Sequence, residues 1–209
     1  MNITVFGATG TIGRPFVEQA LDAGHDVTAV TRDAARLTRR HDRLTVFEAD
    51  PTDPAACVPP VKDADAVVVV LGGGRGGGVR EAGTRAVVAA MRETGVRRLV
   101  CQSTLGVGSS EVHLTFWWRR VMFGALLRKA FADHVAQEAV VEASGLDWTI
   151  VRPSAFTDAP AIEVGEVRHG FGAGQQGLRL KVRRDDVAAF LLAEAEGATY
   201  LHQAVSLSA

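Results

Sequence analysis

The amino-acid sequence predicts one α/β domain, residues 1–209, built on a doubly wound, mostly parallel sheet of strand order 3-2-1-4-5-6. Short apolar runs rich in β-branched residues alternate with stretches of helical patterning along most of the chain. The fourth of these runs contains Val67, Val68, Val69 and Val70 in succession. Continuous apolar strands of this kind are typical of a parallel sheet that is buried on both faces.

The predicted elements follow one another regularly up to residue 151. Strands are expected at residues 3–6, 27–30, 44–47, 66–71, 99–101 and 148–151. Helices are expected at 14–23 and 81–94, and each stops at a glycine, Gly24 or Gly95, as helices commonly do. Beyond residue 151 the pattern weakens to short strands at 162–167 and 178–182, a helix at 185–194 and a strand at 204–207. We expect residues 153–183 and 199–209 to form a small lobe on the substrate side.

Composition narrows the classes of function. The 47% hydrophobic content suffices for a sizeable core, and the net charge of −1 favours neither nucleic acid nor an anionic membrane. The first residues lack the features of a secretion signal, and no apolar run is long enough to cross a bilayer. Cys57 and Cys101 lack CxxC spacing, and no HExxH or close Cys/His cluster occurs. We expect a cytoplasmic protein with reduced thiols, no metal, and no nucleic-acid or membrane partner.

A glycine-spaced turn stands between the first strand and the first helix. Gly7, Gly10 and Gly13 give a GxxGxxG spacing in the sequence GATGTIG, residues 7–13. Glycines let the backbone approach a pyrophosphate closely, and a helix N-terminus offers free N–H groups and the positive end of its dipole. The turn therefore predicts a dinucleotide site. The alternative interpretation is a tight turn that holds no ligand.

The end of the second strand indicates which dinucleotide is bound. The strand leads into Thr31, Arg32 and Asp33. An acidic residue near this position holds the ribose hydroxyls of NAD, whereas an arginine pairs with the 2′-phosphate of NADP. Arg32, assisted by Arg36, therefore predicts NADP. Two alternatives remain: Asp33 reaches the ribose in a register shifted by one residue, or Arg32 is an ordinary surface arginine.

Several motifs along the chain, taken together, are characteristic of one superfamily. They are GATGTIG at 7–13, VTRD at 30–33, EAD at 48–50, DAV at 65–67, VCQST at 100–104, DHV at 133–135, SGLDWTIVRP at 144–153 and RDDVA at 184–188. With these motifs the chain resembles the atypical branch of the short-chain dehydrogenases/reductases. Within that branch it is most similar to the biliverdin reductase B (flavin reductase) type and to the NmrA-like NADP-binding proteins. The resemblance covers nearly the whole chain and is specific for fold and cofactor.

The resemblance implies NADPH lying across the carboxyl ends of the strands, where doubly wound folds bind their ligands. Gly7 and its neighbours would hold the pyrophosphate. The implied contacts are Thr9, Gly10, Thr11 and Ile12 at the pyrophosphate, Arg32 at the 2′-phosphate, Asp50 beside the adenine, Leu71, Gly72 and Gly73 along the ribose and nicotinamide, and Pro153, Ser154, Ala155 and Phe156 under the nicotinamide.

The catalytic residues depart from those of ordinary dehydrogenases of this superfamily. Many members carry Tyr-x-x-x-Lys, but the one tyrosine here, Tyr200, has no lysine four residues on, and His134 stands where that lysine would fall. The candidate catalytic residues are Ser103 and Thr104, which could bind a polar substrate atom or the nicotinamide amide, and His134, which could donate a proton. Their alternative roles are structural, as hydroxyls that close a strand end and as a histidine on a helix.

Three functions are compatible with these residues. The resemblance implies an NADPH-dependent reductase that transfers hydride to a conjugated acceptor such as a flavin, quinone or tetrapyrrole, because that chemistry requires no catalytic tyrosine. An NADP(H)-binding sensor without turnover, of the NmrA type, is the second. The third is an isomerase or tailoring enzyme that uses the same cofactor.

An aromatic and basic segment, residues 116–131, follows the fifth predicted strand. It holds two of the three tryptophans of the chain and three of the nine phenylalanines. It is interpreted as a lid or wall of an aromatic substrate pocket, as the interface of a homodimer, or as a membrane-surface helix. The alternative is a buried helix whose arginines reach solvent at its ends. The protein is expected to be a monomer or a homodimer.

Overall fold

The computed structural model describes residues 1–74, 77–114, 116–160, 165–172, 175 and 177–209. Its main sheet has the order β3-β2-β1-β4-β5-β6-β10-β8, which confirms the predicted order of the first six strands and extends it by two. Described neighbours in this sheet pair in parallel except β10 and β8, which are antiparallel. The strands are β1 (Asn2–Phe6), β2 (Asp26–Thr31), β3 (Leu44–Glu48), β4 (Ala66–Val69), β5 (Arg98–Gln102), β6 (Asp147–Pro153), β8 (Arg168–His169) and β10 (Gln203–Ser208).

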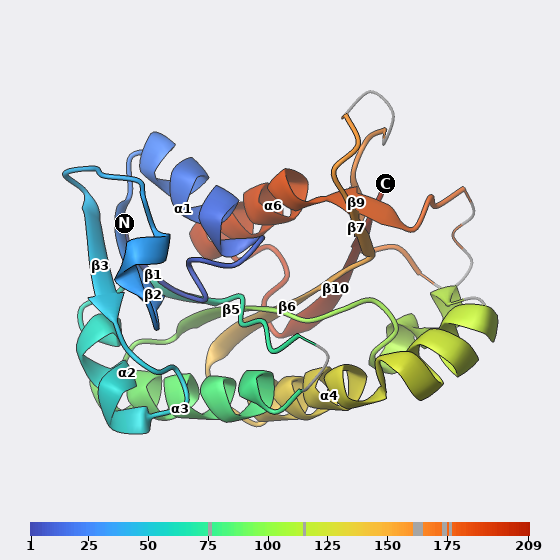
Figure 1. Cartoon of the computed structure of the whole chain (residues 1–209), viewed down its shortest axis with the longest axis horizontal. Coiled ribbons are helices and arrows are strands. Elements are labelled where there is room, and N and C mark those ends of the chain that lie inside the picture. The colour runs from blue at the N-terminus through green and yellow to red at the C-terminus, as the bar shows by residue number, and fades with distance from the viewer. Residues whose placement is uncertain (75–76, 115, 161–164, 173–174, 176) are drawn as a thin grey trace.

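Helices cover both faces of this sheet, as the predicted fold class requires. Figure 1 shows α1 and α6 on one face and α2, α3 and α4 on the other. Each layer packs on its own cluster of buried apolar side chains, and strand valines contribute to both clusters. The helices are α1 (Gly13–Asp22), α2 (Pro54–Val61), α3 (Val79–Thr94), α4 (Arg128–Glu142) and α6 (Arg184–Gly197), with the 3-10 helices η1 (Ala34–Arg36) and η2 (Gly108–His113) and the π-helix η3 (Trp118–Leu126).

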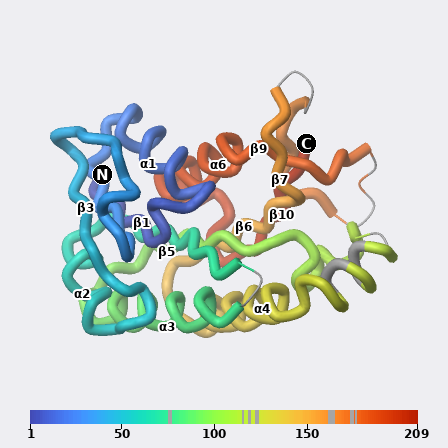
Figure 2. The backbone as a smooth tube through the Cα atoms, in the orientation of Figure 1, coloured from blue at the N-terminus to red at the C-terminus, as the bar shows by residue number. Residues whose placement is uncertain are grey.

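The two ends of the chain meet on one face of the sheet. Figure 2 shows α1, near the N-terminus, beside α6, near the C-terminus, and the Gln19 side-chain amide donates to the backbone oxygen of Asp185 at 3.1 Å. Residues far apart in sequence therefore share one buried layer. The carboxyl ends of the parallel strands lie at one edge of the sheet, and the predicted cofactor site is at this edge.

Two elements of the N-terminal half differ from their predictions. The helix α2 was not predicted because Pro54, Pro59 and Pro60 interrupt its sequence. Pro54 stands in the first turn, where a missing N–H costs nothing, and the Pro60 carbonyl accepts a hydrogen bond from the Thr4 hydroxyl at 2.6 Å. The strand β4 ends at Val69, two residues earlier than predicted, so residues 70 and 71 belong to the loop above the sheet.

The chain after residue 153 is only partly as predicted. The strands β7 (Ala155–Thr157) and β9 (Lys181–Arg183) form a separate two-stranded sheet, within the expected lobe of residues 153–183. The predicted strand at 162–167 lies partly outside the described residues, and that at 178–182 overlaps β9 only at its end. The strand β10 is correctly placed in sequence, but it belongs to the main sheet beside β6 and not to the lobe.

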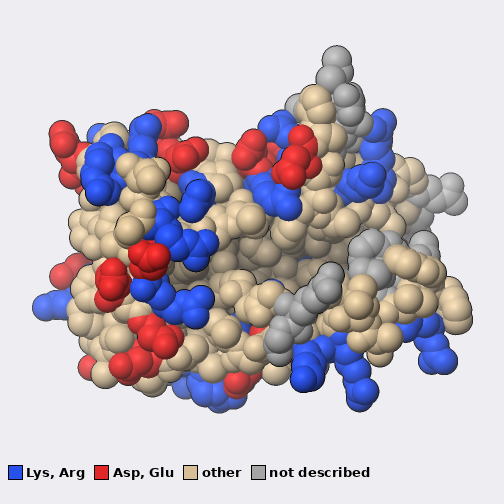
Figure 3. Space-filling view, in the orientation of Figure 1, with Lys and Arg blue, Asp and Glu red and all other residues tan. Residues whose placement is uncertain are grey.

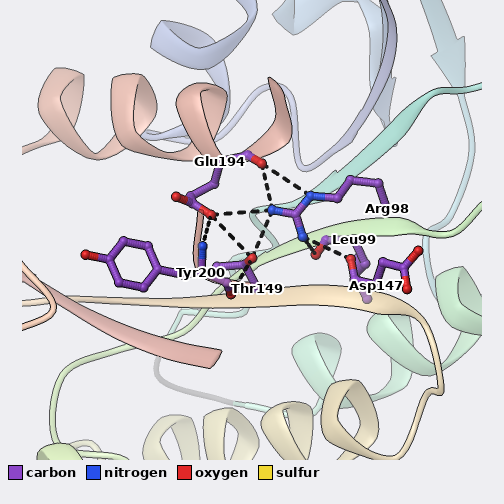
Figure 4. Close-up of polar contacts among 6 residues, drawn as sticks. All are labelled: Arg98, Leu99, Asp147, Thr149, Glu194 and Tyr200. Atoms are coloured by element: carbon purple, nitrogen blue, oxygen red, sulfur yellow. Dashed lines mark hydrogen bonds and ion pairs between the residues drawn. The ribbon is translucent and has the colours of Figure 1, made fainter. Parts of the chain in front are cut away.

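A buried polar cluster holds the amino-terminal side of the sheet to α6. Figure 4 shows the Arg98 guanidinium between β5, β6 and the end of α6. It donates to the Glu194 carbonyl at 2.6 Å, to the Thr149 hydroxyl at 2.9 Å and to the Asp147 carbonyl at 2.9 Å. The Glu194 carboxylate lies 3.5 Å from Arg98 and accepts from the backbone N–H of Tyr200 at 3.0 Å. These bonds are structural. They lie where β5 and β6 begin, at the opposite end of the strands from the predicted site.

Most of the large apolar side chains that the structure describes in the aromatic and basic segment are exposed, unlike those of the buried helix considered as its alternative. Its described side chains Phe116, Trp117, Val121 and Leu126 are exposed. The aromatic and basic composition of the segment could not by itself distinguish an exposed lid or interface from a buried helix. Among the described residues, no helix has the length and apolarity that crossing a membrane would need.

Candidate functional site

Two adjoining cavities open at the carboxyl ends of the parallel strands. The first, of about 290 Å³, is lined by the glycine turn, the end of β2 and the loop after β4, and we call it the turn cavity. The second, of about 220 Å³, is lined by Ser103, Ser154 and His134 of α4, among others, and we call it the serine cavity. Arg80, Gln102 and Phe156 line both. Figure 3 shows the hollow across this face, with Lys and Arg side chains along its rim.

The geometry of the turn requires its glycines. Gly7 has a φ of +93°, and a Cβ there would lie 2.6 Å from the Val70 carbonyl oxygen. A Cβ on Gly13 would lie 2.2 Å from the Gly7 carbonyl oxygen, so the helix packs directly on the turn. Ile12, at the N-cap of α1, provides no side-chain hydrogen bond; the backbone N–H of Arg14 donates to the Gly10 carbonyl at 3.1 Å, and Pro15 has no N–H to offer. The close packing of the turn on the loop after β4 and on α1 therefore requires glycines, which the predicted dinucleotide site requires as well.

The two charged residues after β2 have different surroundings. The Asp33 carboxylate accepts from the backbone N–H of Ala35 at 3.1 Å and so caps the 3-10 helix η1. Arg32, Asp33 and Arg36 are all exposed and all line the turn cavity. The Asp33 side chain therefore has a local structural role, whereas the charge of Arg32 lies at the cavity beside it.

The structure brings most of the predicted cofactor residues together, with two exceptions. Asp50 and Gly73 line neither cavity, although Pro51, the neighbour of Asp50, lines the turn cavity. Hydrogen bonds from the Thr52 N–H and hydroxyl lower the pKa of Asp50, and the charge of Arg32 lowers it further. The predicted residues that line the turn cavity are Gly7, Thr9, Gly10, Thr11, Ile12, Arg32, Leu71, Gly72 and Phe156; those that line the serine cavity are Ser103, Thr104, His134, Pro153, Ser154, Ala155 and Phe156.

The serine cavity contains buried polar atoms without partners. The Ser103 Oγ, Ser154 Oγ and His134 Nδ1 atoms have no hydrogen-bond partner among the described residues. Their residues are only 1%, 5% and 9% exposed. An unpaired polar group in such surroundings costs about 1–3 kcal/mol, so native proteins rarely leave one unsatisfied without a reason. Three such atoms in one cavity indicate a polar ligand.

Ser103 and Thr104 are distinguished by their bonds. The backbone N–H of Ser103 donates to the Val151 carbonyl at 2.7 Å, which completes the strand end and leaves its hydroxyl unused. The Thr104 hydroxyl reaches the Leu105 carbonyl at 3.5 Å. The strand-end alternative therefore describes Thr104, whereas the Ser103 hydroxyl is available to a ligand.

His134 lies on α4, and an ion pair fixes this helix to β6. One turn further on, Glu138 forms a buried bidentate ion pair with Arg152 of β6, at 2.6 and 3.0 Å. Burial, followed by the positive charge of Arg80, lowers the pKa of His134 to about 4. At neutral pH the imidazole is uncharged, so it can form hydrogen bonds but is not a strong acid.

Arg80 and Gln102 are cavity residues that the sequence analysis missed. Gln102 lies inside a motif used for the resemblance, but nothing in its spacing distinguished it from its neighbours. Arg80 is in the first turn of α3, whose predicted start at residue 81 excluded it. The N-cap position of the helix is occupied by Gly78, which has no side chain, so the usual sequence signal of a helix start is absent.

Other candidate groups lie away from the cavities. The Tyr200 hydroxyl lies 2.7 Å from His169 Nδ1 and lines neither cavity. Cys57 and Cys101 are free and buried, and burial raises the pKa of the Cys57 thiol to about 12. Within the described ranges, no group of three or more His, Cys, Asp or Glu side chains could hold a metal ion. Leu127, in the segment 116–131, lines the serine cavity.

Comparison with known proteins identifies the family of this chain. The family described as NAD(P)H-binding matches residues 7–197. A divinyl chlorophyllide a 8-vinyl-reductase of Zea mays is 29% identical over 212 residues, covering 90% of this chain, although this chain spans only 50% of the maize protein.

Two solved structures share the fold over nearly their whole length. A short-chain dehydrogenase/reductase of Veillonella parvula in complex with NADP is 20% identical, with a TM-score of 0.83 and coverage of 100% of this chain and 94% of the other. An anaerobilin reductase of Escherichia coli O157:H7 is 25% identical, with a TM-score of 0.79 and coverage of 99% and 96%.

Proposed function

Because this chain belongs to the NAD(P)H-binding family, we propose that it is an NADPH-dependent reductase of a conjugated small molecule such as a flavin, quinone or tetrapyrrole. The observation that carries the proposal is the continuity of the two cavities through Arg80, Gln102 and Phe156. A dinucleotide along the turn cavity would present its nicotinamide to this junction, and the serine cavity would hold the acceptor beside it.

The preference for NADPH over NADH is assigned to Arg32. Its guanidinium is exposed at the cavity while the neighbouring Asp33 carboxylate caps η1. An arginine matches a phosphate with a fork of N–H donors, which a neutral ribose hydroxyl cannot exploit as well. Arg36 lines the same cavity and adds positive charge near that phosphate.

The residues of the chain would mainly bind and orient. NADPH supplies the hydride when bound. The side chains of Leu105, Leu114 and Leu180 form an apolar wall of the serine cavity that limits access of water. The hydroxyls of Ser103 and Ser154 would donate to polar atoms of the acceptor. Since Tyr200 lies elsewhere and His134 is uncharged at neutral pH, the proton that completes the reduction would come from solvent.

Binding without turnover is the second candidate. The observation in its favour is the uncharged His134, which leaves the serine cavity without a strong proton donor among its described lining residues. A sensor of this type would bind NADP(H) and pass the redox state to a partner. The acceptor panel described next separates the two candidates.

The test is NADPH oxidation with FMN, menadione and biliverdin as acceptors, with NADH as the matched cofactor. We expect oxidation with at least one acceptor, faster with NADPH than with NADH. The Ser103→Ala variant should lower the rate with that acceptor and leave NADPH affinity unchanged. Tight NADPH binding without oxidation of any acceptor would sink the reductase proposal and favour the sensor.

The setting of this activity is part of the same proposal. The partner is a small molecule, and the balanced charge of the chain supports a cytoplasmic protein that acts as a monomer or homodimer. The exposed residues Phe116 and Trp117 of the segment 116–131 support its role as an interface or lid near the serine cavity.

A further inference from the structure

Arg80 places a buried positive charge where the two cavities meet. Its side chain is only 12% exposed, and it lines both the turn cavity and the serine cavity. The Nη1 atom lies 3.3 Å from the Oδ2 atom of Asp133, whose side chain is 2% exposed. A cation in this position is costly to bury unless it has enough partners, so the remaining donors of the guanidinium decide its role.

The Asp133 carboxylate does not serve Arg80 alone. Its Oδ2 atom accepts from the backbone N–H of Arg80 at 3.2 Å, and its Oδ1 atom accepts from that of Glu81 at 3.0 Å. It therefore caps α3 from a distant part of the chain, in place of Gly78. A guanidinium carries five N–H donors, and the Arg80 Nε atom is buried without a partner among the described residues. Arg80 thus retains unused donors.

The surroundings of Arg80 in the serine cavity favour a negatively charged ligand. The described residues that line this cavity include one arginine and no aspartate or glutamate. The hydroxyls of Ser103 and Ser154 can donate to the same ligand, and both lack partners among the described residues. Leucine and proline side chains complete the wall and suit an apolar, flat body.

We propose that the serine cavity binds a conjugated or aromatic carboxylate, with Arg80 holding its carboxylate and Ser103 and Ser154 donating hydrogen bonds. The inference rests on the proposed function for one point only, that this anion is the hydride acceptor. Arginine binds a carboxylate through two parallel N–H donors, so the contact fixes the plane of the ligand as well as its position. The substrate class is thereby narrowed from conjugated acceptors to those that carry a carboxylate.

The test is calorimetric titration of the protein saturated with NADP⁺, with 1-naphthoate and the neutral, similarly shaped 1-naphthamide as probes. We expect the wild-type protein to bind 1-naphthoate at least about tenfold more tightly than the amide, since bonds to a charged group are the stronger ones. Arg80→Met should abolish the preference, and Arg80→Lys should keep part of it. Arg85→Met is the matched control, because Arg85 lies on the same helix with an exposed side chain.

Several results would overturn the inference. They are equal affinity for the two probes, no binding of either at millimolar concentration, or a preference that survives Arg80→Met. A loss of NADP⁺ affinity in Arg80→Met with the naphthoate preference intact would assign Arg80 to the cofactor and would also overturn it. The Arg80→Lys variant provides the comparison if Arg80→Met does not fold.

The outcome for the proposed function is read separately. An Arg80-dependent preference for 1-naphthoate in a protein that oxidises NADPH with no acceptor would remove the reductase proposal and keep the anion site. Oxidation of NADPH with neutral acceptors and no preference between the probes would remove the anion site and keep the reductase.

Discussion

The turn cavity and the serine cavity adjoin, yet they differ in how many of their polar side chains have hydrogen-bond partners within the chain. Around the turn cavity, several side chains have partners within the chain: the Thr31 hydroxyl bonds Thr9 and the backbone of Asp33, and the Asp33 carboxylate accepts from the N–H of Ala35. In the serine cavity, Ser103 and Ser154 are buried without partners among the described residues. Several polar side chains of the turn cavity are therefore paired without a ligand, whereas the two serine hydroxyls of the serine cavity stay in an unfavourable state that a ligand would relieve.

The largest expected effect breaks the turn cavity through its backbone. In Gly13→Ala the new Cβ would stand 2.2 Å from the Gly7 carbonyl oxygen, so the turn or the helix must move. We expect NADPH affinity to fall roughly 100-fold or more, about 3 kcal/mol. The measurement is a fluorescence titration with NADPH. Gly197→Ala is the control, because a Cβ there meets only the Thr199 hydroxyl oxygen, at 3.8 Å. Unchanged affinity in Gly13→Ala would mean that the turn does not hold the cofactor.

The next effect sharpens the cofactor preference of the turn cavity. Arg32→Ala removes a charge-assisted contact to the 2′-phosphate, and we expect a loss of about 1.5–3 kcal/mol in NADPH binding. NADH binding should change little, since NADH has no 2′-phosphate. Dissociation constants of both cofactors measure the effect, with Arg39→Ala as a control that lines neither cavity. Equal losses for both cofactors would contradict the assignment.

The third effect exposes the cost of burying His134 in the serine cavity. Its pKa is lowered to about 4 in the folded protein, so the unfolded chain takes up a proton first as the pH falls below about 6.5. Stability is therefore lost as the pH falls through the window between these values, and by about pH 5 the loss is about 2 kcal/mol. Urea unfolding of His134→Gln should lack this part of the slope.

The control for that slope is a histidine outside the cavities. His202 is exposed, and its positive φ of 55° suits asparagine, so His202→Asn should keep the wild-type dependence on pH. Identical slopes for wild type and His134→Gln would show that His134 is not held uncharged by burial.

The smallest effect compares one hydroxyl from each cavity. Thr31→Val removes the bonds to Thr9 and Asp33 and should lower the free energy of unfolding by about 1 kcal/mol or more. Ser103→Ala removes a hydroxyl without a partner among the described residues and should leave stability unchanged or raise it by up to about 1 kcal/mol. Both are measured by urea unfolding without ligand, and equal losses would erase the distinction between the cavities.

The sequence predicted the turn cavity well because its determinants are local. Gly7, Gly10 and Gly13 encode a backbone shape within seven residues, and apolar runs encode the buried strands around it. The strand order and most strand positions followed from the same alternation. The helix α2 was missed because Pro59 and Pro60 argue against a helix locally, while its packing against α3 outweighs that preference.

The serine cavity was predicted only in part because its walls come from distant segments. Ser103, His134 and Ser154 were identified through a resemblance, not through a local pattern. Arg80 gave no signal, since the cap that begins its helix is Asp133, more than fifty residues later. The exposure of Phe116 and Trp117 could not be predicted from the sequence either, because aromatic residues occur both in cores and at interfaces.

The remote cap made by Asp133 has a consequence for how such a protein can change its substrate over evolution. Asp133 precedes His134, which lines the serine cavity, and its carboxylate also fixes the first turn of α3 after the loop that lines the turn cavity. Exchange of α4 as a block between relatives would leave α3 uncapped unless the new helix brought its own aspartate. We therefore expect new substrate specificities to arise by single replacements of residues near Asp133. Asp133 itself, and its position opposite the first turn of α3, should be retained.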